Sequence, residues 1–430
     1  MTVSTHMAYK ALVWYKFVVG RPKGSTTTAK ARYPQGGILK RKLVITALAG
    51  LLSATTGLVG IGGFAASASA SSKPIIVGEI SGTTGAYAAI GQAAFNSVKM
   101  AAAAINASGG ILGRKVKVLY GNDGANATTS SLLFKKFVSE GAVAILGSLD
   151  TGPTTVAVSN AMKFPDVGNI DEGGVYPNGP TKAPYPWAWS TSMNGYGVGE
   201  VIGSYAMNHC STGLYIMHDP TAYGTTGNTG ILTTYTKKTL GDDAITENWS
   251  SSSPAAATMD AELTKIKASG ADCVEAWLTA QDQATFVNEM HSLGDKFTII
   301  GNDTTNSTGV FASLAGANAK GVLAEELGIL AKAPSPALKK YTKAYVKEFK
   351  IQPSIWGMVS YDGLMVLAQA IKNGRSTSKN TIKTQLNKLK NYHGLTGNLS
   401  FTKMIHTSIN GPQFNMVRYN TSTKKWSVVK

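Results

Sequence analysis

From residue 73 onward, strand-like and helix-like segments alternate along the chain. A short apolar run at 74–80 precedes an Ala-rich segment at 91–107, in which apolar residues recur every three or four positions. The alternating stretch KVKVLYGND, a helical pattern at 127–139 and the apolar run AVAILGS follow. Short apolar runs that alternate with amphipathic segments predict a parallel sheet with helices on both faces.

The connection INASGGILGRKVKV joins the first predicted helix to the second predicted strand. Gly109 and Gly110 supply the left-handed conformation that ends a helix, and Gly113 supplies a tight turn. We therefore expect the chain to reverse here and to enter the sheet beside its first strand.

A second alternating set begins near residue 196. The predicted elements are helix 196–209, strand 214–218, helix 228–239, strand 244–249, helix 256–268, strand 272–278, helix 281–293, strand 297–301, helices 335–350, 355–373 and 379–389, and strands near 414–419 and 426–429. The stretch KGVLAEELGI between them is interpreted as a crossing segment. Because no long linker separates the two sets, we expect an α/β fold of two doubly wound parallel-sheet lobes with a ligand cleft between them.

The first 70 residues differ in composition from the rest, with nine basic residues and no Asp or Glu. The stretch LKRKLVITALAGLLSATTGLVGIGGFAASASA has a basic start, an apolar centre and a small-residue end, which predicts a cleaved export signal. Residues 43–64 are also long enough for a membrane anchor. Residues 1–38 precede the signal and are explained either by a misassigned start codon or by a disordered extension. We therefore assign residues 1–70 to an N-terminal extension and export signal.

The remaining chain is moderately basic, with 32 basic and 24 acidic residues and a net charge of +8. In ALKKYTKAYVKEFK and NTIKTQLNKLKN the lysines lie largely opposite the apolar residues, which predicts solvated helix faces. No basic cluster is interleaved with aromatic residues, so nucleic acid is excluded as a partner. Attraction to an anionic envelope surface stays open.

The chain has two cysteines, Cys210 and Cys273, each at or just before the start of a strand-like run. If the two strands are neighbours in a doubly wound half, an exported protein can join them by a disulfide. Two separate buried thiols are the alternative. Neither cysteine lies near the signal, so the exported chain has no cysteine there for a lipid anchor, and we expect it in the periplasm, outside the cell or at the envelope.

The stretch VGEISGTTGAYAAIGQAAFNSVKMAAAAINASGGILGRKVKVLYGND, with FVSEGAVAILGS and HDPTAYG, resembles the branched-chain amino acid (Leu/Ile/Val) type of ABC-transporter solute-binding proteins, which have the periplasmic binding protein type I fold. The resemblance implies three hinge crossings, placed near 191–193, 326–328 and 396–399. It divides the chain into lobe 1, residues 74–192 plus 328–397, and lobe 2, residues 193–327 plus 398–430. It also implies a monomer that closes on a small solute, docks on a membrane permease and needs no cofactor.

The resemblance also implies a ligand site for a zwitterion. Thr151 and Gly152, in GSLDTGPTT, stand where the family holds the solute's carboxylate, and Thr151 is equally suited to cap the following helix. Tyr223, in HDPTAYG, and Tyr87, after the first strand, match aromatic positions of the cleft wall. Asp303, in IIGNDTT, matches the carboxylate that meets the ammonium, with a turn-forming role as the alternative. Trp277 covers the ligand or belongs to the core.

Three acidic residues depart from the family pattern. Asp150 replaces a small or hydroxyl residue, and Asp171 and Glu172, in GNIDEGG, replace an Ala-Thr-like pair. If these acids face the cleft, they repel a second carboxylate and favour a solute with extra positive or hydroxyl character. An unpaired charge in a dry site is costly, so we expect an amino acid or related amine rather than simply leucine.

The sequence contains no motif that is typical of an enzyme. The histidines show no metal-ligand spacing, and the chain has neither a Gly-rich phosphate loop nor a nucleophile elbow. We therefore expect no catalytic residue and no metal. An extracytoplasmic sensor of the same fold, signalling to a receptor instead of a permease, is the alternative function.

Overall fold

The structure is a computed structural model that describes residues 73–85, 87–170, 172–176, 182–220, 222–246, 249, 255–307, 309–327, 334–409 and 413–429. The predicted export signal lies outside the described residues. No described helix combines the length and the apolar character needed to cross a membrane.

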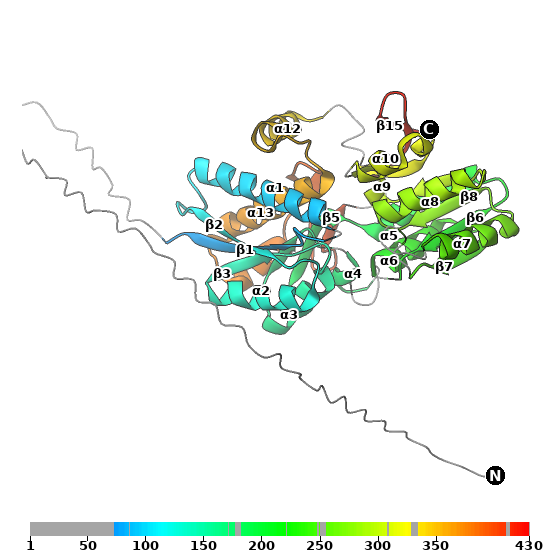
Figure 1. The fold of residues 1–430 in the computed structure, drawn as a ribbon. Helices are drawn as coiled ribbons and strands as arrows, with labels where there is room; N and C mark the ends of the chain where they lie inside the picture. Colours follow the sequence, from blue (N-terminus) through cyan, green and yellow to red (C-terminus); the bar gives the residue numbers. More distant parts are fainter. Residues whose placement is uncertain are drawn as a thin grey trace, which may run out of the picture. The chain divides into compact units, whose positions relative to one another are not determined.

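Among the described residues, six strands form a parallel first sheet in the order β13-β5-β4-β3-β1-β2. These strands are β1 (Ile75–Ser81), β2 (Val116–Asn122), β3 (Ala142–Leu146), β4 (Asp166–Gly168), β5 (Ala188–Met193) and β13 (Thr407–Ile409). The helices of this part are α1 (Ala88–Ala107), α2 (Ala127–Ser139), α3 (Gly152–Met162), α4 (Glu172–Val175), α12 (Pro336–Phe349), α13 (Ile355–Gly374) and α14 (Lys379–Leu386). Figure 1 shows α1 and α13 on one side of β1 and β3, and α2 and α3 on the other. The prediction of a sheet covered on both faces is confirmed.

The second sheet has the order β15-β14-β10-β9-β8-β6-β7. Its strands are β6 (Leu214–His218), β7 (Gly241–Ala244), β8 (Cys273–Trp277), β9 (Thr298–Gly301), β10 (Leu323–Leu327), β14 (Phe414–Asn420) and β15 (Lys425–Val428). The associated helices are α5 (Gly195–His209), α6 (Ala222–Thr234), α7 (Ala255–Ser269), α8 (Ala280–Ser292), α9 (Asp303–Ser307), α10 (Val310–Ala315) and the 3₁₀ helix at Gly316–Ala319. The strands from β7 to β10 are parallel, whereas β14 and β15 add antiparallel pairs at one edge. A short hairpin of β11 (Tyr392–His393) and β12 (Asn398–Leu399) lies outside both sheets.

The connection between α1 and β2 has the predicted geometry. Gly109, Gly110 and Gly113 all have positive φ, between 74° and 93°. A Cβ atom on Gly110 would lie 2.1 Å from the carbonyl oxygen of Arg114, so a side chain there would collide with the backbone of the turn. Glycine is therefore required for both the conformation and the space.

Two elements of the second set differ from the sequence prediction. Helix α6 occupies 222–234 instead of 228–239, and β7 occupies 241–244 instead of 244–249. Helices α5 and α6 approach each other closely: a Cβ atom on Gly199 would lie 2.1 Å from the Gly227 oxygen, and one on Gly230 would lie 2.0 Å from the Tyr196 oxygen. Glycines weaken a helical pattern in the sequence, but here they allow two helices to pack with their backbones in contact.

The chain passes between the sheets three times. It leaves the first sheet after β5, at Met193, and the second after β10, at Leu327, close to the predicted crossings. The third crossing was predicted at 396–399, whereas the chain changes sheets between β13 and β14, after Ile409. The segment at 395–396 has a different role, because Asp362 of α13 accepts hydrogen bonds from the backbone of Leu395 and Thr396, each 2.9 Å long.

Cys210 and Cys273 form a disulfide, with their Cα atoms 5.7 Å apart. Residue Leu214 of β6 pairs with Cys273 of β8, so the two cysteines meet at one end of neighbouring parallel strands. This pairing decides between the two alternatives left by the sequence. A loop of this length is commonly stabilised by about 2–4 kcal/mol when it is cross-linked.

Candidate functional site

The start of α3 carries the residues that were predicted to hold a solute carboxylate. The Thr151 hydroxyl lies 2.6 Å from Oδ2 of Asp123 and 2.8 Å from the Ser130 hydroxyl, and Thr151 is only 5% exposed. Its side chain does not cap α3. The hydroxyl is therefore engaged by a carboxylate of the protein itself, and its contact with a solute, like that of Gly152, stays a prediction.

Asp150 lies beside this cluster. The Ser148 hydroxyl donates to Asp150 Oδ1, and a Cβ atom on Gly82 would lie 2.3 Å from Asp150 Oδ2. Burial raises the pKa of Asp150, and the charge of Asp123 raises it further. The family resemblance assigns an anion to the N-terminal end of α3. Two acidic side chains, Asp123 and Asp150, lie beside that end.

Helix α4 connects the two parts of the molecule. It contacts both α3 and α6, and a Cβ atom on Gly174 would lie 3.0 Å from the backbone nitrogen of Pro153. Glu172 is the first residue of α4, whereas Asp171 and the Glu172 side chain lie outside the described residues. The structure therefore brings this segment next to the start of α3 and to α6, while the orientation of its two acids stays untested.

Tyr223, Trp277 and Asp303 come together beside the second sheet. The Tyr223 hydroxyl donates to Asp303 Oδ1, and the Tyr223 ring meets Trp277 edge-on, with ring centroids 5.4 Å apart. Trp277 is fully buried, and a Cβ atom on Gly227 would lie 2.4 Å from its ring. Trp277 thus supports Tyr223 from within the core. Tyr87, at the start of α1 and 37% exposed, belongs to the other part of the molecule.

The turn between β9 and α9 fixes the position of Asp303. Asn302 donates to the carbonyl of Leu278 at 3.0 Å and accepts from the Thr304 amide at 2.9 Å. Gln283 also donates to Asn302, at 3.0 Å. Asn302 thus makes hydrogen bonds within this turn, and the Asp303 side chain accepts a hydrogen bond from Tyr223; which of its two predicted roles Asp303 has stays untested.

Asp303 lines a cavity of about 240 Å³. The cavity lies where the end of β5, helix α9, strand β10 and the start of α13 meet. The acidic side chains of its wall are Asp303, Glu325 and Glu326, and its apolar side chains include Met193, Leu327, Ile355 and Met358. Pockets for small ligands commonly have volumes of about 300–1,000 Å³, so this cavity suits a small solute.

Comparison with known proteins identifies the fold. Residues 74–423 match the family model described as periplasmic binding protein. The chain belongs to the periplasmic binding protein family.

Three relatives of this periplasmic binding protein show the range of the family. The Leu/Ile/Val-binding protein homolog 2 of Brucella abortus (strain 2308) is 25% identical over 332 residues, which cover 76% of this chain and 86% of that protein. The branched-chain amino acid transporter substrate binding protein of Streptococcus pneumoniae, solved with isoleucine, has a TM-score of 0.70 at 19% identity and covers 83% and 99% of the two chains. An ABC transporter solute binding protein of R. palustris, solved with benzoate, has a TM-score of 0.69 at 16% identity and covers 83% and 95%. The two structures share the fold, and their bound solutes differ in charge and shape.

Membership of this family makes the protein a solute-binding protein and not an enzyme. Its buried carboxylates therefore serve the fold or the solute. Within the described residues, no group of three or more His, Cys, Asp or Glu side chains is arranged to hold a metal ion.

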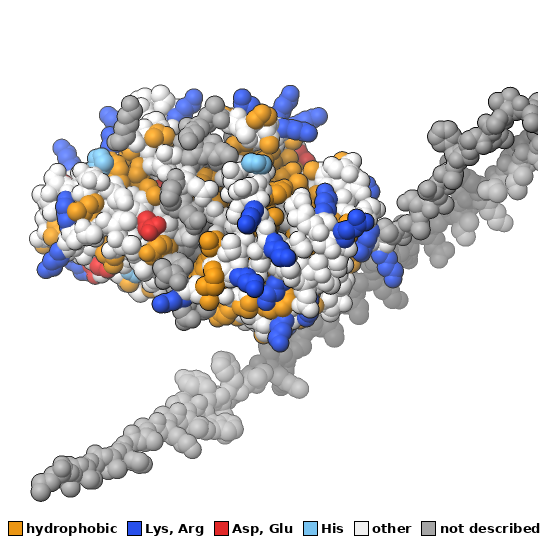
Figure 2. Space-filling model, turned by 180° about the vertical axis from the view of Figure 1, so that it is seen from behind, with side chains coloured by type: hydrophobic (Ala, Val, Ile, Leu, Met, Phe, Trp, Pro, Cys, Tyr) orange, Lys and Arg blue, Asp and Glu red, His pale blue; other side chains and the backbone are white. Residues whose placement is uncertain are grey.

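The charges of this binding protein are divided between surface and interior. Figure 2 shows Lys and Arg side chains spread over one face, with few Asp and Glu side chains. In the described part of the chain, the fully buried charged side chains include many carboxylates but no Lys or Arg. The buried acids of the described core are therefore not paired with buried Lys or Arg side chains.

Glu325 and Glu326 were not predicted as site residues. Glu325 is 1% exposed, and neither carboxylate oxygen has a hydrogen-bond partner on another described residue. Burial raises its pKa well above the usual value, and the Asp303 charge adds to this effect; burial also raises the pKa of Glu326. Two adjacent acids inside the apolar run VLAEEL were the available signal, because charged residues are rarely buried without a reason.

Proposed function

We propose that this periplasmic binding protein captures a small polar solute with a cationic group, an amino acid or a related amine, and delivers it to an ABC permease in the membrane. The observation that carries the proposal is the position of Asp303. Its carboxylate lines the cavity, is held by Tyr223 and follows a turn anchored by Asn302. An ammonium group leaves water at little cost only where such a fixed anion replaces its hydration.

The walls of the cavity come from both parts of the molecule. Met193 ends a strand of the first sheet, Asp303 follows a strand of the second, and Met358 belongs to α13, which packs on the first sheet. The Trp356 indole donates to the Ser307 hydroxyl at 3.0 Å and so links α13 to α9. A solute held at such a junction contacts both parts at once, which couples binding to lobe closure.

A thermal-shift screen of the full-length protein tests the proposal. Amino acids, primary amines, amides, sugars and benzoate are compared at millimolar concentration. A ligand with micromolar affinity that binds only the folded state adds about 4 kcal/mol to stability. We expect the largest shifts with solutes that carry an ammonium group.

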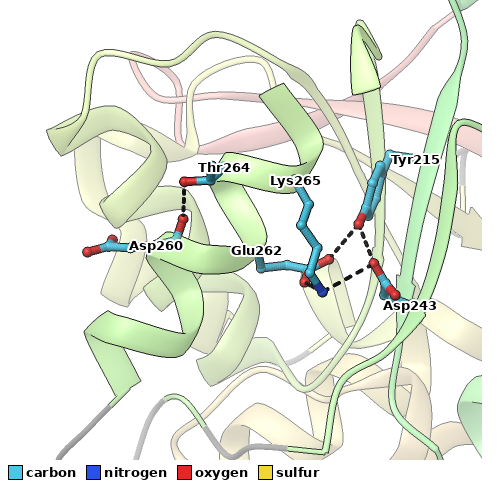
Figure 3. A network of polar contacts seen from close by, with 6 residues as sticks. All are labelled: Tyr215, Asp243, Asp260, Glu262, Thr264 and Lys265. Carbon is cyan, nitrogen blue, oxygen red and sulfur yellow. Dashed lines mark hydrogen bonds and ion pairs between the residues drawn. The ribbon is translucent and has the colours of Figure 1, made fainter. Parts of the chain in front are cut away.

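Asp303→Asn removes the charge while keeping the shape of the side chain. We expect it to weaken the binding of an amine by about a hundredfold, because the ammonium then enters the cavity without its fixed anion. Asp260→Asn is the matched control, since Asp260 is exposed on α7 and its carboxylate points away from the polar network drawn in Figure 3. A solute without a cationic group that alone shifts the protein, or an Asp303→Asn variant that binds amines normally, would rule out the proposal.

A further inference from the structure

We propose that Glu325 forms a second cation subsite beside Asp303, so that the solute is a small organic dication of the diamine class. This inference rests on the function proposed above and specifies its solute. It extends the site to a residue of β10 that the family resemblance did not assign.

The position of Glu325 is fixed by its strand. Its neighbours across the sheet are residues of β14, with Met416 directly opposite. Its carbonyl oxygen accepts a hydrogen bond of 2.7 Å from the side chain of Asn306. The backbone of Glu325 is thus held on both sides at the wall of the cavity.

The side chain of Glu325 lacks the partners that a buried carboxylate needs. It is almost completely buried, lines the cavity and receives no hydrogen bond from another described residue. Leaving such a group unsatisfied costs about 1–3 kcal/mol, and more when it is charged. A second ammonium of the solute, placed beside the Glu325 carboxylate, removes this cost.

The rest of the cavity wall suits the hydrocarbon part of a diamine. Met193, Ile355 and Met358 provide apolar surface opposite the acidic side. A chain of a few methylene groups fits a cavity of about 240 Å³, and its two ends can reach two separate carboxylates. A metal ion is a poorer occupant, because the described residues do not form a metal-binding group of three or more acidic, His or Cys ligands.

The binding of a dication should also depend on pH. Glu325 faces Asp303, Glu326 and Glu275, and Tyr223 lies within electrostatic range of it. The carboxylates favour its protonated form in the empty cavity, while a dication favours the ionised form. Binding therefore releases a proton, and affinity for the dication rises with pH until the pH exceeds the raised pKa that Glu325 has in the empty cavity.

Isothermal titration of the full-length protein with 1,4-diaminobutane, butylamine and leucine tests the inference. We expect 1,4-diaminobutane to bind at least about tenfold more tightly than butylamine, because two charge pairs form instead of one. Glu325→Gln should reduce this preference by about tenfold or more while changing butylamine affinity less than about threefold. Glu79→Gln is the matched control: Glu79 is as buried as Glu325 but lies on β1 of the first sheet and does not line the cavity, so the preference should persist.

Equal affinities of the wild-type protein for 1,4-diaminobutane and butylamine would overturn the inference and leave the proposed function intact. The same conclusion follows if leucine binds and neither amine does, or if Glu325→Gln keeps the full preference. The wild-type comparison remains decisive even if the variant does not fold. If none of the three probes binds and Asp303→Asn has no effect with any ligand from the screen, the proposed function itself fails.

Discussion

The part of the molecule built on the second sheet contains two acidic clusters, of which one includes a lysine. In the first, Asp243 and Glu262 share the hydroxyl of Tyr215, and Lys265 lies 2.8 Å from Glu262 and 3.6 Å from Asp243 (Figure 3). In the second, Asp303 receives the hydroxyl of Tyr223, and Glu325 lies nearby in the same cavity. The first cluster includes its own cation, whereas no Lys or Arg belongs to the described lining of the second.

This difference separates a network that includes its own cation from the proposed binding site. Lys265 is more than half exposed, so the first cluster is neutralised at the surface with little desolvation. The second cluster is buried, and its acids raise one another's proton affinity. In the function proposed above, the solute supplies the cation that the described lining of this cavity lacks.

Among the variants that test this comparison, Glu325→Gln is expected to change the stability of the solute-free protein the most. The pKa of Glu325 is raised above its usual value of 4.5, so its stabilising contribution is present below pH 4.5 and is lost as pH rises through the folded-state pKa. Relative to wild type, the variant should therefore gain stability as pH increases from 4 to 8, by about 2 kcal/mol. Urea unfolding at several pH values measures the difference in the free energy of unfolding between the variant and wild type. A difference that stays constant with pH would show that Glu325 does not have a raised pKa.

A smaller effect is expected when the paired cluster loses its cation. Lys265→Met leaves the buried Glu262 with the Tyr215 hydroxyl but without its cation, and we expect a loss of about 1 kcal/mol because the lysine is largely solvated. Amine binding should not change, since Lys265 does not line the cavity. Thermal melting and titration of one preparation test both statements, and a loss of amine affinity would show that the two clusters are not independent.

The smallest effect is expected from Asp243→Asn, and its pH dependence has the opposite sign. The Tyr215 hydrogen bond lowers the pKa of Asp243, with a further contribution from Lys265. The stability it provides is thus present above pH 3.8 and is lost as pH falls through the folded-state pKa. The variant should be less stable than wild type by about 0.5 kcal/mol at pH 7, with the difference becoming smaller as pH falls below 3.8. Melting curves at pH 3 and pH 7 suffice, and an equal deficit at both values would refute the explanation.

The sequence predicted most of the regular elements because their patterns are local. Helix α2 was predicted at its observed bounds, and α13 was predicted to within one residue of its end. The short strands β4, β5 and β13 were not predicted. Each is completed by pairing with distant segments, and three residues such as Thr407–Ile409 carry no period that distinguishes a strand from a loop.

The candidate site was predictable only where one residue carries the chemistry. Asp303 was assigned because the family resemblance implies a carboxylate at this strand end; it lines the cavity, and its contact with a solute stays a prediction. The engagement of Thr151 by Asp123 was not foreseen, because 28 residues separate them along the chain. Glu325 was overlooked for a similar reason: its meaning depends on Asp303 and α13, which reach it only in the folded molecule.

By itself, the sequence determined the alternation of strands and helices, the glycine-dependent turn at Gly109–Gly113 and the family resemblance, since each depends on neighbouring residues. The tertiary structure alone decided that Cys210 meets Cys273, that α5 and α6 pack through their glycines, and that one acidic cluster contains a lysine while the other does not. Charge compensation is a property of distances in space. It is set by which strands become neighbours, and a linear pattern does not encode it.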